Sequence, residues 1–324
     1  MNHDDLVREM SVLLAPRRLS PELPEGSVTA RLPAGVLAAP LIAIPDCHLS
    51  DAGEGDEFFD DDHENIDRLE GVLRAITAFV ERHPDACVVQ LGDWFDLWRA
   101  SSGAIQDAPA YKTILELDAA LGLRHIVGNH DATFVNEVPR LRQDDASAFR
   151  LGDFLMPSVF AIHGHQGHVA SPDHDDFDEI VVAAATTVAR FFPGVRTIEE
   201  FIDSDLDVDD ALKALVHKTF GTAHGDPAPA ARPRDARTGA PDPEAPFVVR
   251  ENADVIAAIV ANVATMTKQP MPKLVLVGHS HNPCVAWSNV AESPTILVDA
   301  GACVFGRFNL LLGAGDRITV FDVS

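Results

Sequence analysis

The chain has 324 residues and a formal net charge of −25, from 25 Lys and Arg residues against 50 Asp and Glu residues. Its length fits one large domain with an insertion, or two closely packed units, and a hydrophobic content of 46% allows a sizeable core. The negative charge argues against a general nucleic-acid binder, which needs a basic surface. No apolar run is long enough to span a bilayer and the first residues lack a secretory pattern, so we expect a soluble, cytoplasmic protein with no transmembrane segment.

We expect residues 1–40 to form an N-terminal arm and residues 41–324 to form the main domain. Apolar residues at helical spacing predict a helix over residues 64–82. Short apolar runs predict buried strands that end at a Pro, Gly or His, over residues 41–44, 87–91, 123–127, 159–162 and 274–277. The alternation of strands and helices predicts an α/β fold, with helices covering a sheet.

Residues 166–270 differ from the rest in composition, and we expect them to form a helical cap or insertion. Within this segment, residues 222–246 are rich in Pro, Ala and Gly, which is typical of a mobile loop or linker. Helical patterns flank the loop at residues 180–192, 208–220 and 253–267. Four closing strands are predicted after the insertion, over residues 284–290, 295–298, 308–312 and 317–323.

Five short motifs occur in order, each directly after a predicted strand. They are Asp46-Cys47-His48, Gly92-Asp93-Trp94-Phe95-Asp96, Gly128-Asn129-His130-Asp131, His163-Gly164-His165 and Gly278-His279-Ser280-His281. Each motif is weak alone, but together they supply carboxylate, imidazole and amide groups. These groups suit Mn²⁺, Fe, Zn²⁺ or Mg²⁺ and need no thiolate.

The ordered set resembles the calcineurin-like metallophosphoesterase superfamily over residues 46–281. The resemblance implies an α/β fold built as a four-layer αββα sandwich, and a centre of two divalent metal ions. We favour Mn²⁺, and Fe or Zn²⁺ fits the same ligands. The ligands that the resemblance assigns are Asp46, His48 and His281 for one metal, Asn129, His163 and His279 for the other, and Asp93 as the bridge.

The resemblance also implies a mechanism. Two metals held about 3.5–4 Å apart activate a water, which attacks phosphorus in line with the leaving oxygen. His130 would protonate the leaving group, and Asp96 would hold the tautomer of His130 through a hydrogen bond.

Three further residues are candidates for substrate contact. His165 either lines the pocket or serves as a donor behind the ligands, and Trp94 either contacts substrate or packs a strand-to-helix corner. The guanidinium fork of Arg99 suits a phosphate or carboxylate, although a surface salt bridge explains it equally well. The other histidines, including His125, are expected to be surface or ordinary polar residues, and Asp131 to cap a helix.

Two departures narrow the substrate class. Leu97 and Trp98 stand where protein serine/threonine phosphatases usually have Arg-Gly, and Asp131 stands where they have Glu, which argues against that class. The motifs look more like bacterial phosphoesterases related to UDP-2,3-diacylglucosamine pyrophosphatases, although those enzymes often carry Arg at the position of His130. We therefore expect hydrolysis of a phosphodiester or pyrophosphate in a small molecule. The alternatives are a phosphomonoesterase, a nuclease or a non-catalytic metal-binding scaffold, and the oligomeric state stays open.

Overall fold

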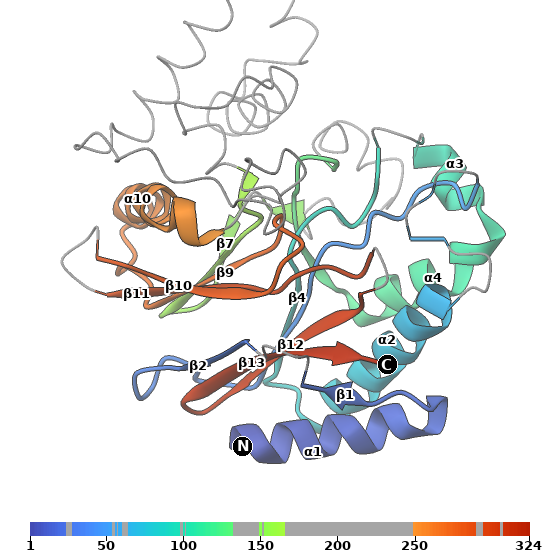
Figure 1. The fold of residues 1–324 in the computed structure, drawn as a ribbon, viewed down its shortest axis with the longest axis horizontal. Coiled ribbons are helices and arrows are strands. Elements are labelled where there is room, and N and C mark those ends of the chain that lie inside the picture. Colours follow the sequence, from blue (N-terminus) through green and yellow to red (C-terminus); the bar gives the residue numbers. More distant parts are fainter. Residues whose placement is uncertain are drawn as a thin grey trace, which may run out of the picture.

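The chain is a mixed α/β protein with two mixed sheets of eight and five strands (Figure 1). This confirms the predicted α/β class. The computed structural model describes residues 1–23, 28–53, 56, 58–59, 64–97, 100, 102–131, 149–150, 152–165, 249–289, 294–304 and 307–324. The helices expected at residues 180–192 and 208–220, and the loop expected at 222–246, lie outside these residues. Within them, no helix is both long and apolar enough to cross a membrane.

The larger sheet has the strand order β1-β13-β12-β3-β4-β5-β6, and β2 also pairs with β13. Four neighbouring strands are parallel: β3 (Leu41–Ile44), β4 (Cys87–Gln90), β5 (Arg124–Ile126) and β6 (Phe149–Arg150). The remaining strands are antiparallel to their neighbours: β12 (Asn309–Ala314), β13 (Arg317–Val323), β1 (Pro21–Glu22) and β2 (Val28–Arg31). Residues 1–40 therefore contribute two strands to this sheet.

The smaller sheet has the order β10-β11-β9-β8-β7. Its parallel centre consists of β8 (Val159–Ile162), β9 (Leu274–Val277) and β11 (Thr295–Asp299). Antiparallel strands flank this centre, namely β7 (Gly152–Met156) and β10 (Cys284–Ser288).

The helices lie against the outer faces of the two sheets (Figure 1). Those near the larger sheet are α1 (His3–Leu14), α2 (Glu64–Arg82), the short α3 (Ser102–Asp107) and α4 (Lys112–Leu121), with 3₁₀ turns at Ala15–Arg17 and Pro109–Tyr111. The helix α10 (Val249–Thr267) packs on the smaller sheet.

Buried apolar side chains fall into three clusters. Since side chains alternate along a strand, Ile42 and Ile44 of β3 pack toward α1 and α2, whereas Leu41 and Ala43 pack against the smaller sheet. A third cluster joins α10 to the outer face of the smaller sheet. Both faces of β3 are therefore buried, which explains why its sequence is a continuous apolar run.

Several predicted elements have the predicted bounds, including β3, α2, β8 and β9. The helix predicted at residues 253–267 begins earlier, at Val249. The five motifs follow β3, β4 and β5 of the larger sheet and β8 and β9 of the smaller sheet. Parallel neighbours end at the same edge of a sheet, so the fold brings all five motif loops to one place.

Candidate metal centre

Four of the predicted ligands have left-handed backbone conformations. The φ angles are 53° at His48, 49° at Asp93, 75° at His279 and 53° at His281. Residues other than glycine rarely adopt this region, and each costs roughly 1–3 kcal/mol. Such strain is typical of functional sites, where the surrounding structure holds a side chain in a required direction.

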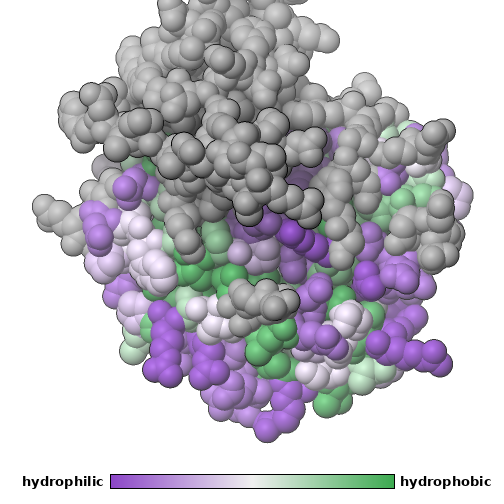
Figure 2. Space-filling model, in the orientation of Figure 1, coloured by the Kyte–Doolittle hydropathy of each residue, from purple (hydrophilic) through white to green (hydrophobic). Residues whose placement is uncertain are grey.

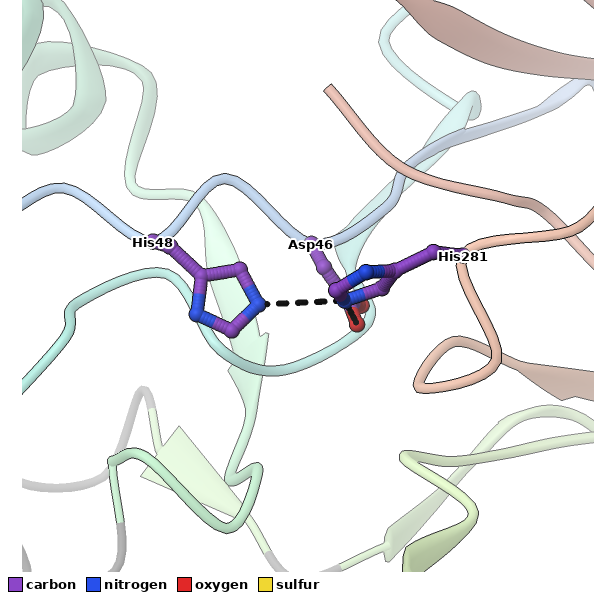
Figure 3. Close-up of side chains that lie close together, drawn as sticks. All are labelled: Asp46, His48 and His281. Carbon is purple, nitrogen blue, oxygen red and sulfur yellow. Dashed lines mark hydrogen bonds and ion pairs between the residues drawn. The ribbon is translucent and has the colours of Figure 1, made fainter. Parts of the chain in front are cut away.

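The first group of ligand-type side chains is Asp46, His48 and His281, whose ligand atoms all lie within 4.8 Å of one another. The Nε2 atoms of His48 and His281 face each other at 3.2 Å, and Nε2 of His281 is 3.4 Å from Oδ2 of Asp46 (Figure 3). The Oδ1 atom of Asp46 is buried and accepts no hydrogen bond from the described residues. Two imidazole nitrogens that converge beside a carboxylate form a suitable donor set for a divalent cation.

The second group is Asp93, His163 and His279, again within 4.8 Å. Nε2 of His163 is 3.2 Å from Oδ2 of Asp93 and 3.1 Å from Oδ1 of Asn129. Nδ1 of His163 donates to the carbonyl of Leu91 at 2.9 Å, which leaves Nε2 as the nitrogen that faces the site. This second bond fixes the tautomer that metal-binding histidines use.

Asp93 lies close to side chains of both groups. Its Oδ2 atom lies 3.2 Å from Nε2 of His163 and 3.7 Å from Nε2 of His48, and its Oδ1 atom accepts the backbone N–H of His130 at 2.8 Å. His48, Asp93 and His130 form another close group of ligand-type side chains. Asp93 therefore lies between the two groups of ligand-type side chains.

The buried carboxylates dominate the electrostatics of the site. Burial alone would lower the pKa of His163, but the carboxylates of Asp93 and Asp46 outweigh it and raise this pKa to about 10. Burial disfavours the charged form of Asp93, yet His163 and His130 hold its pKa well below the usual value. For His48, burial prevails and lowers the pKa to about 4. A site that pulls positive charge toward Asp46 and Asp93 suits bound cations.

His130 and Asp96 form a pair beside the ligands. Nδ1 of His130 lies 2.9 Å from Oδ1 of Asp96, and the imidazole ring stands edge-on to that of His48, 4.5 Å between centroids. Burial opposes the charged imidazolium, but Asp93 and Asp96 outweigh it and raise the pKa of His130. The side chain of Asp96 is buried, whereas that of His130 is 20% exposed, so the imidazole can meet a ligand that the carboxylate cannot reach.

Asp131 connects two of the motif loops, a role that the sequence analysis missed. Its carboxylate is fully buried and accepts the backbone N–H groups of Gly128 at 3.1 Å, Trp94 at 3.3 Å and Phe95 at 2.9 Å. Burial and the charge of Asp93 raise the pKa of Asp131 to about 7. The residues that follow Asp131, where a capped helix was expected, lie outside the described part of the chain.

Gln90, at the end of β4, is a second missed residue. Its Nε2 atom donates to the carbonyls of Gly92 at 2.6 Å and Pro45 at 3.3 Å, and its Oε1 atom accepts the N–H of Gly92 at 3.0 Å. This side chain therefore joins the loops that carry Asp46 and Asp93. The available signal was a polar residue inside an apolar strand run, which needs buried hydrogen-bond partners.

Two motif glycines provide space rather than a left-handed backbone. A Cβ atom at Gly128 would lie 2.0 Å from Oδ1 of Asp93, and one at Gly278 would lie 2.4 Å from Oδ1 of Asp46. Neither glycine has a φ in the left-handed region. The explanation is therefore the close approach of each carboxylate to the neighbouring backbone.

The remaining candidates have different surroundings. His165 is buried, with its ring centroid 5.4 Å from that of His163. Trp94 is fully buried and packs 5.5 Å from the ring of His125, which matches the packed-corner alternative. His125, which was expected to be a surface or ordinary polar residue, is fully buried and its Nε2 atom pairs with Asp118 at 3.0 Å, which excludes the surface position. Arg99 lies outside the described residues.

Comparison with known proteins finds a weak likeness to solved structures. No family model and no curated protein matches the chain. A solved structure from Staphylococcus aureus, provisionally assigned as a 5′-nucleotidase and determined with alpha-ketoglutarate, matches with a TM-score of 0.34 and 11% sequence identity. The match covers 88% of this chain and 53% of that chain, so the present chain spans about half the length of that protein.

Proposed function

We propose that this chain is a metal-dependent hydrolase of phosphoester bonds with a dinuclear centre, in a four-layer αββα fold of the calcineurin-like type. The observation that carries the proposal is the convergence of five motif loops from two sheets. They bring together two groups of ligand-type side chains, and Asp93 of one group lies 3.7 Å from Nε2 of His48 in the other. The ordered motifs of the sequence favour the same chemistry.

Each proposed metal site takes its ligands from both sheets. Asp46, His48 and His281 would hold one ion, and Asn129, His163 and His279 the other, with Asp93 between them. Two divalent ions held there supply Lewis-acid catalysis and lower the pKa of the attacking water. Mn²⁺ is the proposed metal, since carboxylate, amide and imidazole ligands occur together.

In this proposal His130 is the general acid. A protonated His130 that donates from Nδ1 to Asp96 keeps a second proton at Nε2, available to the leaving-group oxygen. Asp96 acts through His130, by fixing the ring and favouring its charged form.

The proposed substrate is a small molecule with a phosphodiester or pyrophosphate bond. The net charge of −25 disfavours a polyanionic nucleic-acid substrate. A panel of nucleoside diphosphate conjugates, cyclic nucleotides and phosphomonoesters, assayed with Mn²⁺, would separate this proposal from a phosphomonoesterase.

The first test measures metal content and hydrolysis of bis(p-nitrophenyl) phosphate together. We expect about two Mn²⁺ ions per chain by elemental analysis, and loss of both metal and activity in Asp93→Asn. A wild-type chain that binds Mn²⁺ but hydrolyses no member of the panel would instead be a scaffold.

The second test isolates the general acid. His130→Ala should keep its metal and lose about 10²–10⁴-fold in kcat on diphenyl phosphate, whose phenolate leaves poorly without a proton. The loss should be smaller on bis(p-nitrophenyl) phosphate, because nitrophenolate needs less protonation. His83→Ala is the matched control, since His83 pairs with Glu9 at the end of α2 and belongs to none of the five motifs. Equal losses on both esters would exclude His130 as the acid.

A further inference from the structure

A pocket of about 520 Å³ lies between α1 and the strands β2 and β13. None of its lining residues belongs to the five motifs. Figure 1 shows α1 alongside β13, with β2 beside them. Its volume is within the range of small-molecule sites, roughly 300–1,000 Å³.

One end of the pocket carries an unusual pair of arginines. Arg31 of β2 and Arg317 of β13 are direct cross-strand partners. Like charges in this position are destabilising unless an anion lies between them. Arg317 pairs with Asp4 at 2.9 Å, whereas Arg31 forms no ion pair with any residue that the structure describes.

The local charge contrasts with that of the chain. Arg8 also lines the pocket but pairs with Asp5, and Arg317 pairs with Asp4, so Arg31 is the lining guanidinium that forms no ion pair among the described residues. The chain as a whole carries −25. A basic site on so acidic a protein attracts anions locally, and guanidinium forks match phosphate and carboxylate groups.

Beyond the arginine pair, the pocket-lining residues of β2 and β13 are first polar, Thr29 and Thr319, and then aromatic, Phe321. Thr29 and Thr319 are cross-strand partners with their hydroxyl oxygens 3.1 Å apart. His3 is 7% exposed, and neither of its ring nitrogens makes a hydrogen bond to the described residues. Its ring stacks on Phe321 with centroids 6.3 Å apart and planes inclined by 19°. Nδ1 of His3 lies 3.6 Å from Oδ1 of Asp4, which keeps the imidazole at the pocket wall as a polar group that a ligand can meet.

We propose that this pocket binds a small molecule that joins an anionic group, a phosphate or a carboxylate, to an aromatic or apolar body. The anion lies between Arg31 and Arg317 and is within reach of the hydroxyl of Thr29. The body packs against Phe321 and Val7, and His3 hydrogen-bonds to a polar atom on it. Figure 2 shows hydrophobic and hydrophilic side chains interspersed over the described part of the face that it draws.

The test titrates the full chain with phenylphosphonate, a dianion that phosphoesterases do not hydrolyse, using calorimetry. Arg31→Gln should weaken binding at least about ten-fold, because it removes a charge-assisted hydrogen-bond donor. Arg31 is exposed, so the variant should fold and keep the wild-type hydrolysis rate. His281→Ala, which removes a proposed metal ligand, should keep this binding and thereby separates the pocket from the metal centre.

Probes of other charge complete the experiment. Benzoate replaces the phosphonate by a carboxylate and keeps the aromatic body. Inorganic phosphate keeps the anionic group without an aromatic body, and benzylamine keeps the body with the opposite charge. Tighter binding of either aromatic anion than of benzylamine supports the proposal. Three results would overturn the proposal. The first is no binding of phenylphosphonate to the wild-type chain at about 10 mM, the limit for a weak site. The others are equal affinity of Arg31→Gln and the wild-type chain for phenylphosphonate, or equal affinity of the wild-type chain for benzylamine and the aromatic anions.

Discussion

Replacement of Gly128 by alanine tests the geometry of the metal centre with one added methyl group. The new Cβ would lie 2.0 Å from Oδ1 and 2.4 Å from the backbone nitrogen of Asp93. Carbon and oxygen atoms need more than 3 Å, so Asp93 or its loop must move by about 1 Å. A displacement of that size in a catalytic group lowers the rate about 10²-fold, and overpacking costs about 1–3 kcal/mol of stability.

Gly122→Ala is the matched control. Gly122 has a φ of +62° and nothing within 4 Å of its missing Cβ, so alanine there costs about 1 kcal/mol of backbone strain without displacing a neighbour. Both variants would be compared by urea denaturation and by kcat/KM for bis(p-nitrophenyl) phosphate. We expect both to lose stability, and only Gly128→Ala to lose activity. A Gly128→Ala chain that folds and keeps kcat/KM within about threefold would refute the steric argument, since the predicted loss is about 10²-fold.

Three other predictions follow from the site. Mn²⁺ at 100 times its Kd should stabilise the wild-type chain by about 2.7 kcal/mol in thermal melts and leave the stability of Asp93→Asn unchanged. Equal increases in the melting temperature of both chains would mean that Mn²⁺ binds elsewhere. Asp131→Leu should cost at least about 3 kcal/mol in urea denaturation, because three buried N–H groups lose their acceptor, and the exposed Asp85→Leu should change stability little. Cys47 is fully buried, and burial raises its pKa well above the usual value. Iodoacetamide at pH 8 should therefore modify Cys47 only when urea unfolds the chain, as detected by mass spectrometry. Modification in the folded chain would contradict its burial.

The sequence predicts the central strands well because both of their faces are buried. β3, β8 and β9 are continuous apolar runs bounded by polar residues, so their bounds agree with the predictions. The pattern does not predict β1 or β2, because β1 has two residues and β2 includes Thr29 and Arg31, so neither is an apolar run. Their pairing with β13 depends on chain segments nearly 300 positions apart, as the separation of 290 between Thr29 and Thr319 shows.

The candidate ligands can be named from the sequence because their residue types and order are distinctive. Their supporting residues cannot, because a carboxylate such as Asp131 is chosen by which backbone N–H groups surround it. The same limit applies to His125, whose pairing with Asp118 becomes visible only when α4 and β5 pack together. The backbone strain at His279 is likewise a tertiary property, since no local residue preference favours it.

The origin of the ligands in both sheets has a consequence for how the molecule is made. His48 and His281 meet at 3.2 Å although 233 positions separate them, so the first ligand group exists only after a very long loop has closed. Contacts of such high sequence separation form late in folding. A nascent chain that has not yet produced His281 lacks part of this group, so under the proposed function high-affinity metal uptake would require synthesis past His281 and docking of the two sheets.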